Sequence, residues 1–264
     1  MNTRRRLLAG LSLGAALWLA GCAGAPAADP QARAVLAPTG TLRVAVYAGS
    51  PTSFVRKPGG EPAGVAYELG HALGKELAVP VRVLEFERVQ QVVEALKGGQ
   101  ADITVTNATE ARARDVDFTD PVIRLELGYL VMGDSPLRAA ADIDRPGLKI
   151  GVSQGSSSQS SLPRLLRNAA VVPVSSIAAG QQQMRTKALD AFATHKAVLY
   201  EMSDQLPGAR VLEGRWGLES LAIAVPKGRD AARPHLRDFA QKLRSSGELQ
   251  RMVDRAGVRG TAQD

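Results

Sequence analysis

The sequence predicts an α/β protein built of two lobes that are joined by two crossing strands. Strand-like and helix-like segments alternate along most of the chain, which is typical of α/β architectures with largely parallel sheets. Two long extended segments, at 125–132 and 220–226, bracket a separate series of strands and helices. A chain that leaves one lobe and later returns to it forms a hinge, and small ligands bind in the cleft between such lobes.

The expected first lobe contains three strands and two helices before the first crossing. Its strands are the apolar or alternating segments 41–47, 81–86 and 101–107. Its helices cover 64–78 and Val89–Leu96, where apolar residues recur every three or four positions and so share one face. Gly98 and Gly99 end the second helix, because glycine readily adopts the left-handed conformation that follows a helix.

The expected second lobe repeats the alternation between the two crossing segments. Its strands are 148–153, 170–174 and 190–194, and its helices lie around 160–169 and 177–188. Pro163 fits best in a first helical turn, so we expect that helix to begin near Ser160. Two terminal helices, 230–246 and 248–256, complete the fold.

The first 21 residues have the pattern of a signal peptide. Three arginines at 4–6 precede an apolar stretch that is short for a membrane-spanning helix, which needs ~20 residues. The segment Leu19–Cys22 resembles the lipobox of bacterial lipoproteins, which implies that the Cys22 thiol carries a lipid; the alternative is an ordinary secretory signal. Residues 22–39 are rich in alanine and proline, so we expect a lipidated tether there.

Composition argues against several classes of function. Three of the 33 basic residues and no acid lie in the signal peptide, so the net charge falls from +7 to +4 without it, and the basic balance does not indicate nucleic-acid binding. Cys22 is the single cysteine, which excludes an intramolecular disulfide. Three scattered histidines without ligand-spaced neighbours do not indicate a metal site, and we expect no cofactor.

Taken together, several segments of the chain resemble bacterial solute-binding protein family 3, the receptors of polar amino-acid ABC importers. The segments are GTLRVAV (40–46), GVAYELGHALGKEL (64–77), ALKGGQADI (95–103), ATEARARDVDFTDPV (108–122), LKIGVSQGSSS (148–158), LDAFAT (189–194) and LAIAVPKG (221–228). Their order and spacing cover residues 40–257. The resemblance implies a two-lobe, type II-like periplasmic-binding-protein fold, with 40–130 and 223–264 as lobe 1 and 131–222 as lobe 2.

Segment 106–121, TNATEARARDVDFTDP, crowds arginines and acids and on its own is compatible with a solvated surface. In the resembling family, an arginine shortly before the V-D-F-(S/T)-x-P signature binds the ligand carboxylate, and the matching residue is Arg112. A planar guanidinium binds a carboxylate through two parallel hydrogen bonds. Arg114 is then expected to be a solvated neighbour.

Further ligand contacts are implied at strand ends and loops. Thr106 and Asn107 end a strand where parallel sheets present binding groups, although Asn107 could instead cap a turn. Aromatic residues of the first loop, Tyr47 and Phe54, match positions that cover the ligand's apolar part. In lobe 2 the matching hydroxyl residues, at a helix start that could equally be a plain cap, are Ser153, Ser157 and Ser158.

His195 departs from the family pattern. An aspartate at this place usually receives the α-ammonium of the ligand, but segment 190–195 reads DAFATH. A neutral imidazole carries no charge, and a protonated one repels an ammonium. If His195 lines the cleft rather than merely capping the next helix, we expect a carboxylate without an ammonium at that end, or one whose amine is bound elsewhere.

We therefore expect a monomeric, lipid-anchored periplasmic receptor that delivers a small polar carboxylate-bearing solute to an ABC permease, and not an enzyme. Two alternatives are a cleft enzyme of the same fold, such as a periplasmic dehydratase, and a ligand sensor without a transport role. The segment GVSQG matches the nucleophile elbow G-x-S-x-G, with Ser153 as nucleophile. His235 and either Asp190 or Asp204 would then have to complete a triad.

Overall fold

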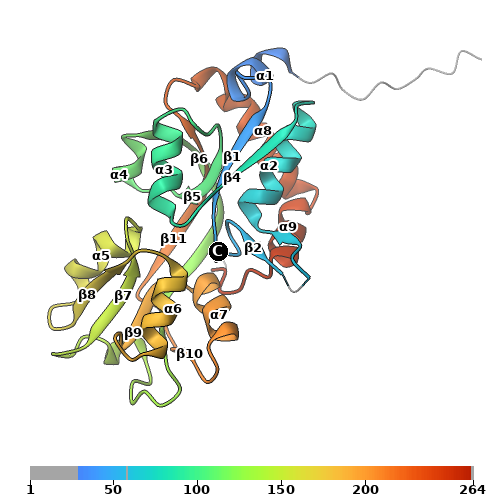
Figure 1. Ribbon diagram of the computed structural model, residues 1–264. Coiled ribbons are helices and arrows are strands. Elements are labelled where there is room, and N and C mark those ends of the chain that lie inside the picture. Colours follow the sequence, from blue (N-terminus) through green and yellow to red (C-terminus); the bar gives the residue numbers. More distant parts are fainter. Residues whose placement is uncertain (1–28, 58, 263–264) are drawn as a thin grey trace, which may run out of the picture.

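Two α/β lobes are joined by two long neighbouring strands in the computed structural model, which describes residues 29–57 and 59–262 (Figure 1). The strands are β6 (Val116–Val131) and β11 (Gly217–Pro226), and they pair antiparallel to each other. The expected signal peptide and the lipidation site at Cys22 lie outside the described residues. No helix within the described ranges is long and apolar enough to cross a bilayer.

Lobe 1 contains both termini of the described chain. Its elements are α1 (Pro30–Leu36), β1 (Leu42–Tyr47), β2 (Val55–Arg56), β3 (Pro62–Ala63), α2 (Val65–Glu76), β4 (Val81–Phe86), α3 (Val89–Lys97), β5 (Thr104–Asn107), α4 (Glu110–Ala113), α8 (Arg233–Ser245) and α9 (Glu248–Ala256). The strands and long helices predicted from apolar spacing are all present. The short hairpin of β2 and β3 was not predicted, because two-residue strands leave no periodic signal.

Lobe 2 lies between the crossings. Its elements are β7 (Lys149–Ser153), α5 (Ser157–Leu165), β8 (Ala170–Val174), α6 (Ile177–Arg185), β9 (Ala191–His195), α7 (Lys196–Gln205) and β10 (Arg210–Val211). The prediction that α5 begins near Ser160 is wrong. Ser156 accepts a hydrogen bond from the Gln159 amide and so starts the helix at Ser157, and Pro163 is accommodated near its end.

The sheets are mixed rather than largely parallel. β1 pairs parallel with β4, and β7 pairs parallel with both β8 and β9. The crossing strands run antiparallel to their neighbours, in the order β5-β11-β6-β9-β7-β8, with β10 also paired to β6. One continuous sheet therefore extends from lobe 1 through the hinge into lobe 2, because two strands that cross between lobes must return in the opposite direction.

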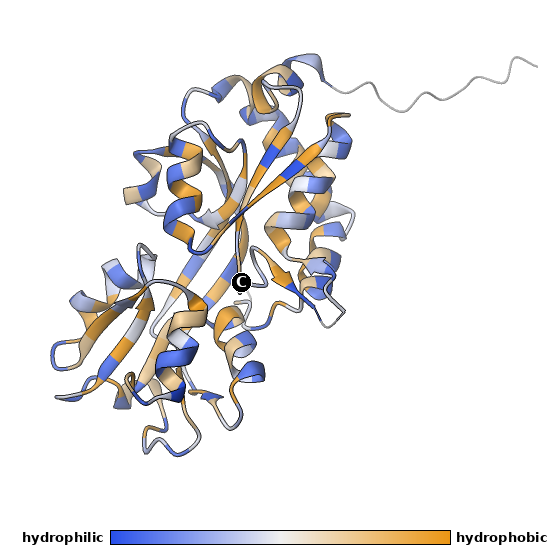
Figure 2. Cartoon of the chain, viewed as in Figure 1, coloured by the Kyte–Doolittle hydropathy of each residue, from blue (hydrophilic) through white to orange (hydrophobic). Residues whose placement is uncertain are grey.

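Each lobe has its own apolar core, seen as orange strands between helices with outward blue faces (Figure 2). On β6 the side chain of Leu125 belongs to the lobe 1 core and that of Tyr129 to the lobe 2 core. On β11 the residues from Leu221 onward belong to the lobe 1 core. We propose that the chain crosses between the lobes at these points, a few residues before the boundaries predicted at 130 and 222.

The predicted tether, residues 22–39, extends too far, because its C-terminal part is folded as helix α1. Asp29 accepts hydrogen bonds from the amides of Gln31 and Ala32 and so begins helix α1. Ala32 and Leu36 are buried in the lobe 1 core. A segment that buries apolar side chains belongs to the fold, so the described part of the chain is packed on lobe 1 from Asp29 onward.

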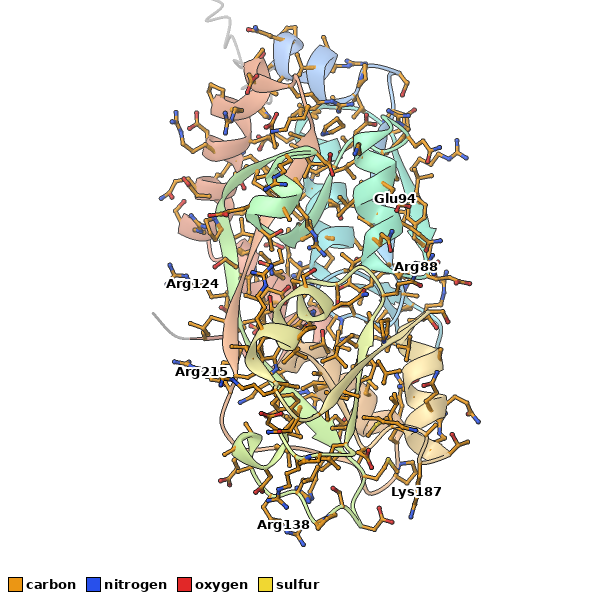
Figure 3. The ribbon with its side chains drawn as sticks, turned by 90° about the vertical axis from the view of Figure 1, so that its left-hand side faces the viewer. Arg88, Glu94, Arg124, Arg138, Lys187 and Arg215 are labelled. Atoms are coloured by element: carbon orange, nitrogen blue, oxygen red, sulfur yellow. The ribbon has the colours of Figure 1, made fainter. Side chains whose placement is uncertain are left out.

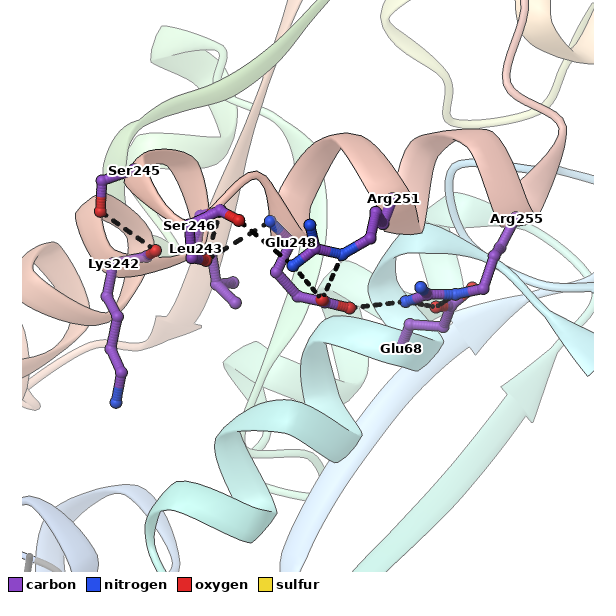
Figure 4. A network of polar contacts seen from close by, with 8 residues as sticks. All are labelled: Glu68, Lys242, Leu243, Ser245, Ser246, Glu248, Arg251 and Arg255. Atoms are coloured by element: carbon purple, nitrogen blue, oxygen red, sulfur yellow. Dashed lines mark hydrogen bonds and ion pairs between the residues drawn. The ribbon is translucent and has the colours of Figure 1, made fainter.

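The C-terminal helices are fastened to lobe 1 by ion pairs. Arg255 on α9 binds Glu68 on α2 and Glu248 at the start of its own helix, and Arg251 binds Glu248 as well (Figure 4). Beyond α9, Thr261 pairs with Leu125 of the crossing strand β6. The C-terminal segment thus lies against the hinge.

A buried ion-pair network stabilises the other end of lobe 1. Asp102 has a fully buried side chain and binds Arg43 through its Nη2 (2.8 Å) and Arg229 (2.7 Å). Burial alone would raise the pKa of this carboxyl, but the hydrogen bonds from Arg43 and Arg229 hold the pKa below its usual value. The acid stays ionised in the interior because both of its oxygens are bound.

Candidate functional site

A small cavity of ≈ 30 Å³ lies where the two lobes meet, and we call it the interlobe cavity. Its polar lining is Tyr47, Thr52, Glu87, Arg88, Thr106, Asn107, Arg112, Ser153, Ser156, Ser157, Thr194, His195 and Glu219. A buried water needs about 10–15 Å³ of such space, so the cavity has room for about two waters. A solute of amino-acid size requires the lobes to stand further apart.

Arg112 is one of two arginines that line the cavity; the other is Arg88. Arg112 Nη1 donates to Thr106 Oγ1 (2.8 Å) and to the Asn107 carbonyl (3.3 Å), and Nη2 points across the cleft to the Gly155 carbonyl (3.5 Å). Burial lowers the pKa of this guanidinium, and the nearby charge of Glu219 opposes that shift. All three acceptors are neutral oxygens, so the guanidinium can still bind an anion.

The loop before α4 aims Arg112 into the cavity. Thr109 caps α4 by accepting the Arg112 amide, which sets the direction of this short helix. Thr106 is buried beside it at the end of β5. The Asn107 side chain accepts the Ser220 amide and so fastens β5 to β11. Thr106 and Asn107 both line the cavity, as expected, but the described contacts of Asn107 are mainly structural.

Tyr47 lines the cavity from the end of β1, where its position depends on the following loop. Its hydroxyl donates to Ser50 Oγ (3.2 Å), which in turn shares a hydrogen bond with Thr52, and its amide donates to Ser53 Oγ. Burial raises the pKa of the Tyr47 hydroxyl, and its hydrogen bond with Ser50 partly opposes that shift. Tyr47 therefore presents a neutral, fixed ring to the cavity.

Two predicted contacts lie elsewhere. Phe54 is buried in the lobe 1 core, with its ring 5.7 Å from Tyr67, and does not line the cavity. Ser158 is buried on α5 and is also absent from the lining, whereas Ser153, Ser156 and Ser157 are present. The helix begins at Ser157, so the turn of the helix carries the next side chain away from the cleft.

His195 has both of the roles that the sequence left open. It is the N-cap of α7, where Nδ1 accepts the Val198 amide (3.4 Å), and it also lines the interlobe cavity. It is 4 % exposed, and this burial lowers the pKa of the imidazole, while the charge of Glu219 opposes the shift. An accepting Nδ1 and a lowered pKa both favour a neutral ring.

Glu219 and Arg88 line the cavity and were not predicted. Glu219 lies on the crossing strand β11, is 7 % exposed and accepts a hydrogen bond from Ser157 Oγ (2.8 Å). Arg88 precedes α3 and lies at the level where the lobes meet (Figure 3). Its Nη1 reaches the Ser175 carbonyl of lobe 2 (3.4 Å), while its buried Nε has no hydrogen-bond partner among the described residues. Single polar residues within apolar or mixed segments carry no local signal, which explains why both were missed.

Close packing between the lobes continues beside the cavity. The backbone at Gly155 approaches α3 so closely that an added Cβ would lie 2.4 Å from Gln90 Cβ. At Gly49 an added Cβ would meet the side chain of Ile177 at 3.3 Å. Glycine fits at these two positions because any larger residue would carry a side chain that holds the lobes apart.

The triad suggested by GVSQG does not form. Ser153 lines the cavity, but His235 lies on α8, where its nitrogens are 3.8 Å from Asp29 and 3.4 Å from Glu76. Trp216 donates through its indole nitrogen to the Gly128 carbonyl and packs near Tyr129 in lobe 2. Within the described residues, no group of histidines, cysteines and acids could hold a metal ion.

Comparison with known proteins gives consistent matches over the folded chain. The family model of the bacterial extracellular solute-binding proteins, family 3, matches residues 42–257. The chain is 24 % identical over 192 residues to the glutamine-binding protein of an ABC transporter from Bacillus subtilis (strain 168), covering 71 % of this chain and 70 % of that protein. It is 26 % identical over 260 residues to a probable histidine-binding protein of Neisseria gonorrhoeae, covering 96 % and 95 %.

A solved structure has the same architecture. An ancestral arginine-binding protein bound to glutamine superposes with a TM-score of 0.73 at 25 % identity, covering 81 % of this chain and 96 % of that one. The two-lobe fold predicted from the order of strands and helices is therefore confirmed.

Proposed function

Because the chain belongs to family 3 of the bacterial extracellular solute-binding proteins, we propose that it is the receptor of an ABC importer for a small polar carboxylate-bearing solute, an amino acid or a related compound. The solute binds between the lobes while they stand further apart than in this structure, the lobes then close around it, and the loaded receptor delivers it to a permease in the inner membrane. The names of the relatives, which denote binding proteins for glutamine and histidine, support a solute of this size and polarity.

The observation that carries this proposal is the guanidinium of Arg112. It lies in the interlobe cavity, it is bound to neutral oxygens of Thr106, Asn107 and Gly155, and no ion pair engages it among the described residues. A buried charge is costly unless it is paired, so a ligand carboxylate that replaces the long contact to Gly155 is stabilised there. Closure around that carboxylate excludes water and strengthens the pair.

The proposal includes attachment to a membrane through a lipid on Cys22, with the folded chain in the periplasm. Its support is the likeness of Leu19–Cys22 to a lipobox and the family's extracellular location. The folded chain is connected to this cysteine by the residues before Asp29. This arrangement keeps a receptor close to its permease and raises its effective concentration there.

A thermal-shift screen of the full chain in mild detergent tests the proposal. The panel contains L-glutamine, L-histidine and L-arginine together with other amino acids, dipeptides and organic acids. At ~100 times its Kd, a true ligand adds roughly 2.7 kcal/mol to the free energy of unfolding, which gives a clear upward shift of the melting temperature. The proposal would be contradicted if no carboxylate in the panel raised the melting temperature. Conversion of a stabilising acid into a product, followed by chromatography, would replace it by the enzyme alternative.

A further inference from the structure

We propose that Glu219 binds the ammonium group of the ligand, so that the solute is an amine-bearing carboxylate rather than a simple organic acid. This inference rests on the proposed function and assigns the second charge of the same site. The geometry behind it is the placement of one buried acid, Glu219, in the cavity that also holds Arg112.

The charges of the cavity are separated rather than paired. The charge of Glu219 acts on the Arg112 guanidinium, yet within the described ranges no ion pair or hydrogen bond joins the two side chains. Glu219 Oε1 accepts from Ser157, a neutral hydroxyl, and its other oxygen has no hydrogen bond from a described residue. A buried carboxylate held by one neutral donor lacks a charged partner. A ligand with a positive end and a negative end can satisfy both sites at once.

The other ionisable groups of the lining are poorly suited to bind an ammonium. His195 is buried, has a lowered pKa and uses Nδ1 to cap α7, so its neutral ring provides no negative charge. Glu87 is exposed, and its charge is screened by water. Arg88 carries the same sign as an ammonium and repels it. Glu219 is therefore the buried acid available within the described lining.

The position of Glu219 on the crossing strand β11 also connects ammonium binding to closure. Ser157, which donates to Glu219, begins helix α5 of lobe 2. Arg112 belongs to lobe 1 and reaches toward Gly155 of lobe 2. A ligand that binds Arg112 and Glu219 together therefore contacts both the hinge and the lobe 1 side of the cleft, and the adjacent start of α5 closes on it.

Matched pairs of ligands test the assignment. Each pair consists of an amino acid and the same acid without its α-amine: L-glutamine and glutaramic acid, L-arginine and 5-guanidinopentanoic acid, L-histidine and 3-(imidazol-4-yl)propionic acid. Calorimetry with the full chain in mild detergent measures both members against the native protein and against Glu219→Gln. This variant can keep the hydrogen bond from Ser157 and loses only the charge. Glu85→Gln is the control, because Glu85 is an acid of lobe 1 that does not line the cavity.

For the pair that binds, we expect the native protein to prefer the amine-bearing member by about 10- to 150-fold, the range for a hydrogen bond to a charged group. We expect Glu219→Gln to reduce that preference to within about threefold, and Glu85→Gln to leave it unchanged. A preference that survives in Glu219→Gln would overturn the assignment, since the amine is then bound elsewhere.

The native protein is decisive even if Glu219→Gln fails to fold. Equal or tighter binding of the members without an amine would overturn the inference and leave the receptor proposal intact. Failure of every carboxylate in the wider panel to bind would overturn the receptor proposal itself. Glu219→Asp, which keeps the charge, is expected to retain at least part of the preference and distinguishes loss of charge from loss of packing.

Discussion

Replacement of Arg112 by alanine removes the group on which the proposed carboxylate site depends. The guanidinium is held by Thr106 and points at Gly155 without an acidic partner in the described cavity, whereas Arg88, the other arginine of the lining, reaches the Ser175 carbonyl. Truncating one partner of a buried charge pair costs about 2–5 kcal/mol of binding free energy. At about 1.4 kcal/mol per tenfold change, the affinity falls by roughly 30- to 4,000-fold.

The matched control is Arg114→Ala, because Arg114 is exposed two residues further along the same segment. Isothermal titration of the tightest ligand from the panel measures both variants, and unfolding by urea checks that both remain folded. Arg112→Lys keeps the charge but loses the planar fork, so we expect an intermediate loss. Similar affinities for Arg112→Ala and Arg114→Ala would refute the reasoning, since the carboxylate is then not bound by this guanidinium.

Four other predictions concern closure, pH, stability and anchoring. Gly155→Ala should weaken ligand binding at least tenfold because its Cβ meets Gln90, whereas Gly147→Ala, with the same positive φ and open space around it, should leave affinity unchanged in calorimetry. The lowered pKa of His195 stabilises the fold above the unfolded value of about 6.5, and this contribution is lost as the pH falls below it. Between about pH 7 and 5 the melting temperature of the native protein should therefore fall more than that of His195→Asn. Parallel curves of melting temperature against pH would contradict this. Asp102→Asn should lower the free energy of unfolding by about 3–5 kcal/mol in urea titrations, because it removes the buried charge that pairs with two partly buried arginines; a loss below about 1 kcal/mol would argue against that role. Cys22→Ala should abolish labelling by radioactive palmitate, and equal labelling of both proteins would exclude lipidation at this residue.

Residues that line the interlobe cavity were predictable where they lie in a segment with a recognisable pattern. Arg112 stands a fixed distance before V-D-F-T-D-P, and Ser153 and Ser157 lie in a loop between a strand and a helix, so each was found without coordinates. Phe54 is a predicted contact because the resembling family covers its ligand with aromatics of the first loop, yet Phe54 is buried in the lobe 1 core. The sequence indicates only that an aromatic residue follows this loop. The path of the loop in the folded protein decides whether its side chain points to the cavity or to the core.

The sequence by itself determined the order of strands and helices, the two crossings and the arginine of the cleft, because apolar periodicity and short motifs are local properties of the chain. Only the tertiary structure decided that the sheet of the crossing strands is mixed, that α1 packs on lobe 1, and that Glu219 and Arg112 line one cavity. Glu219 meets Ser157 across 62 positions of sequence, and its burial arises when two lobes close on a strand that belongs to both. A contact over such a separation is set by the packing of the whole molecule, for which no segment of the chain carries a local signal.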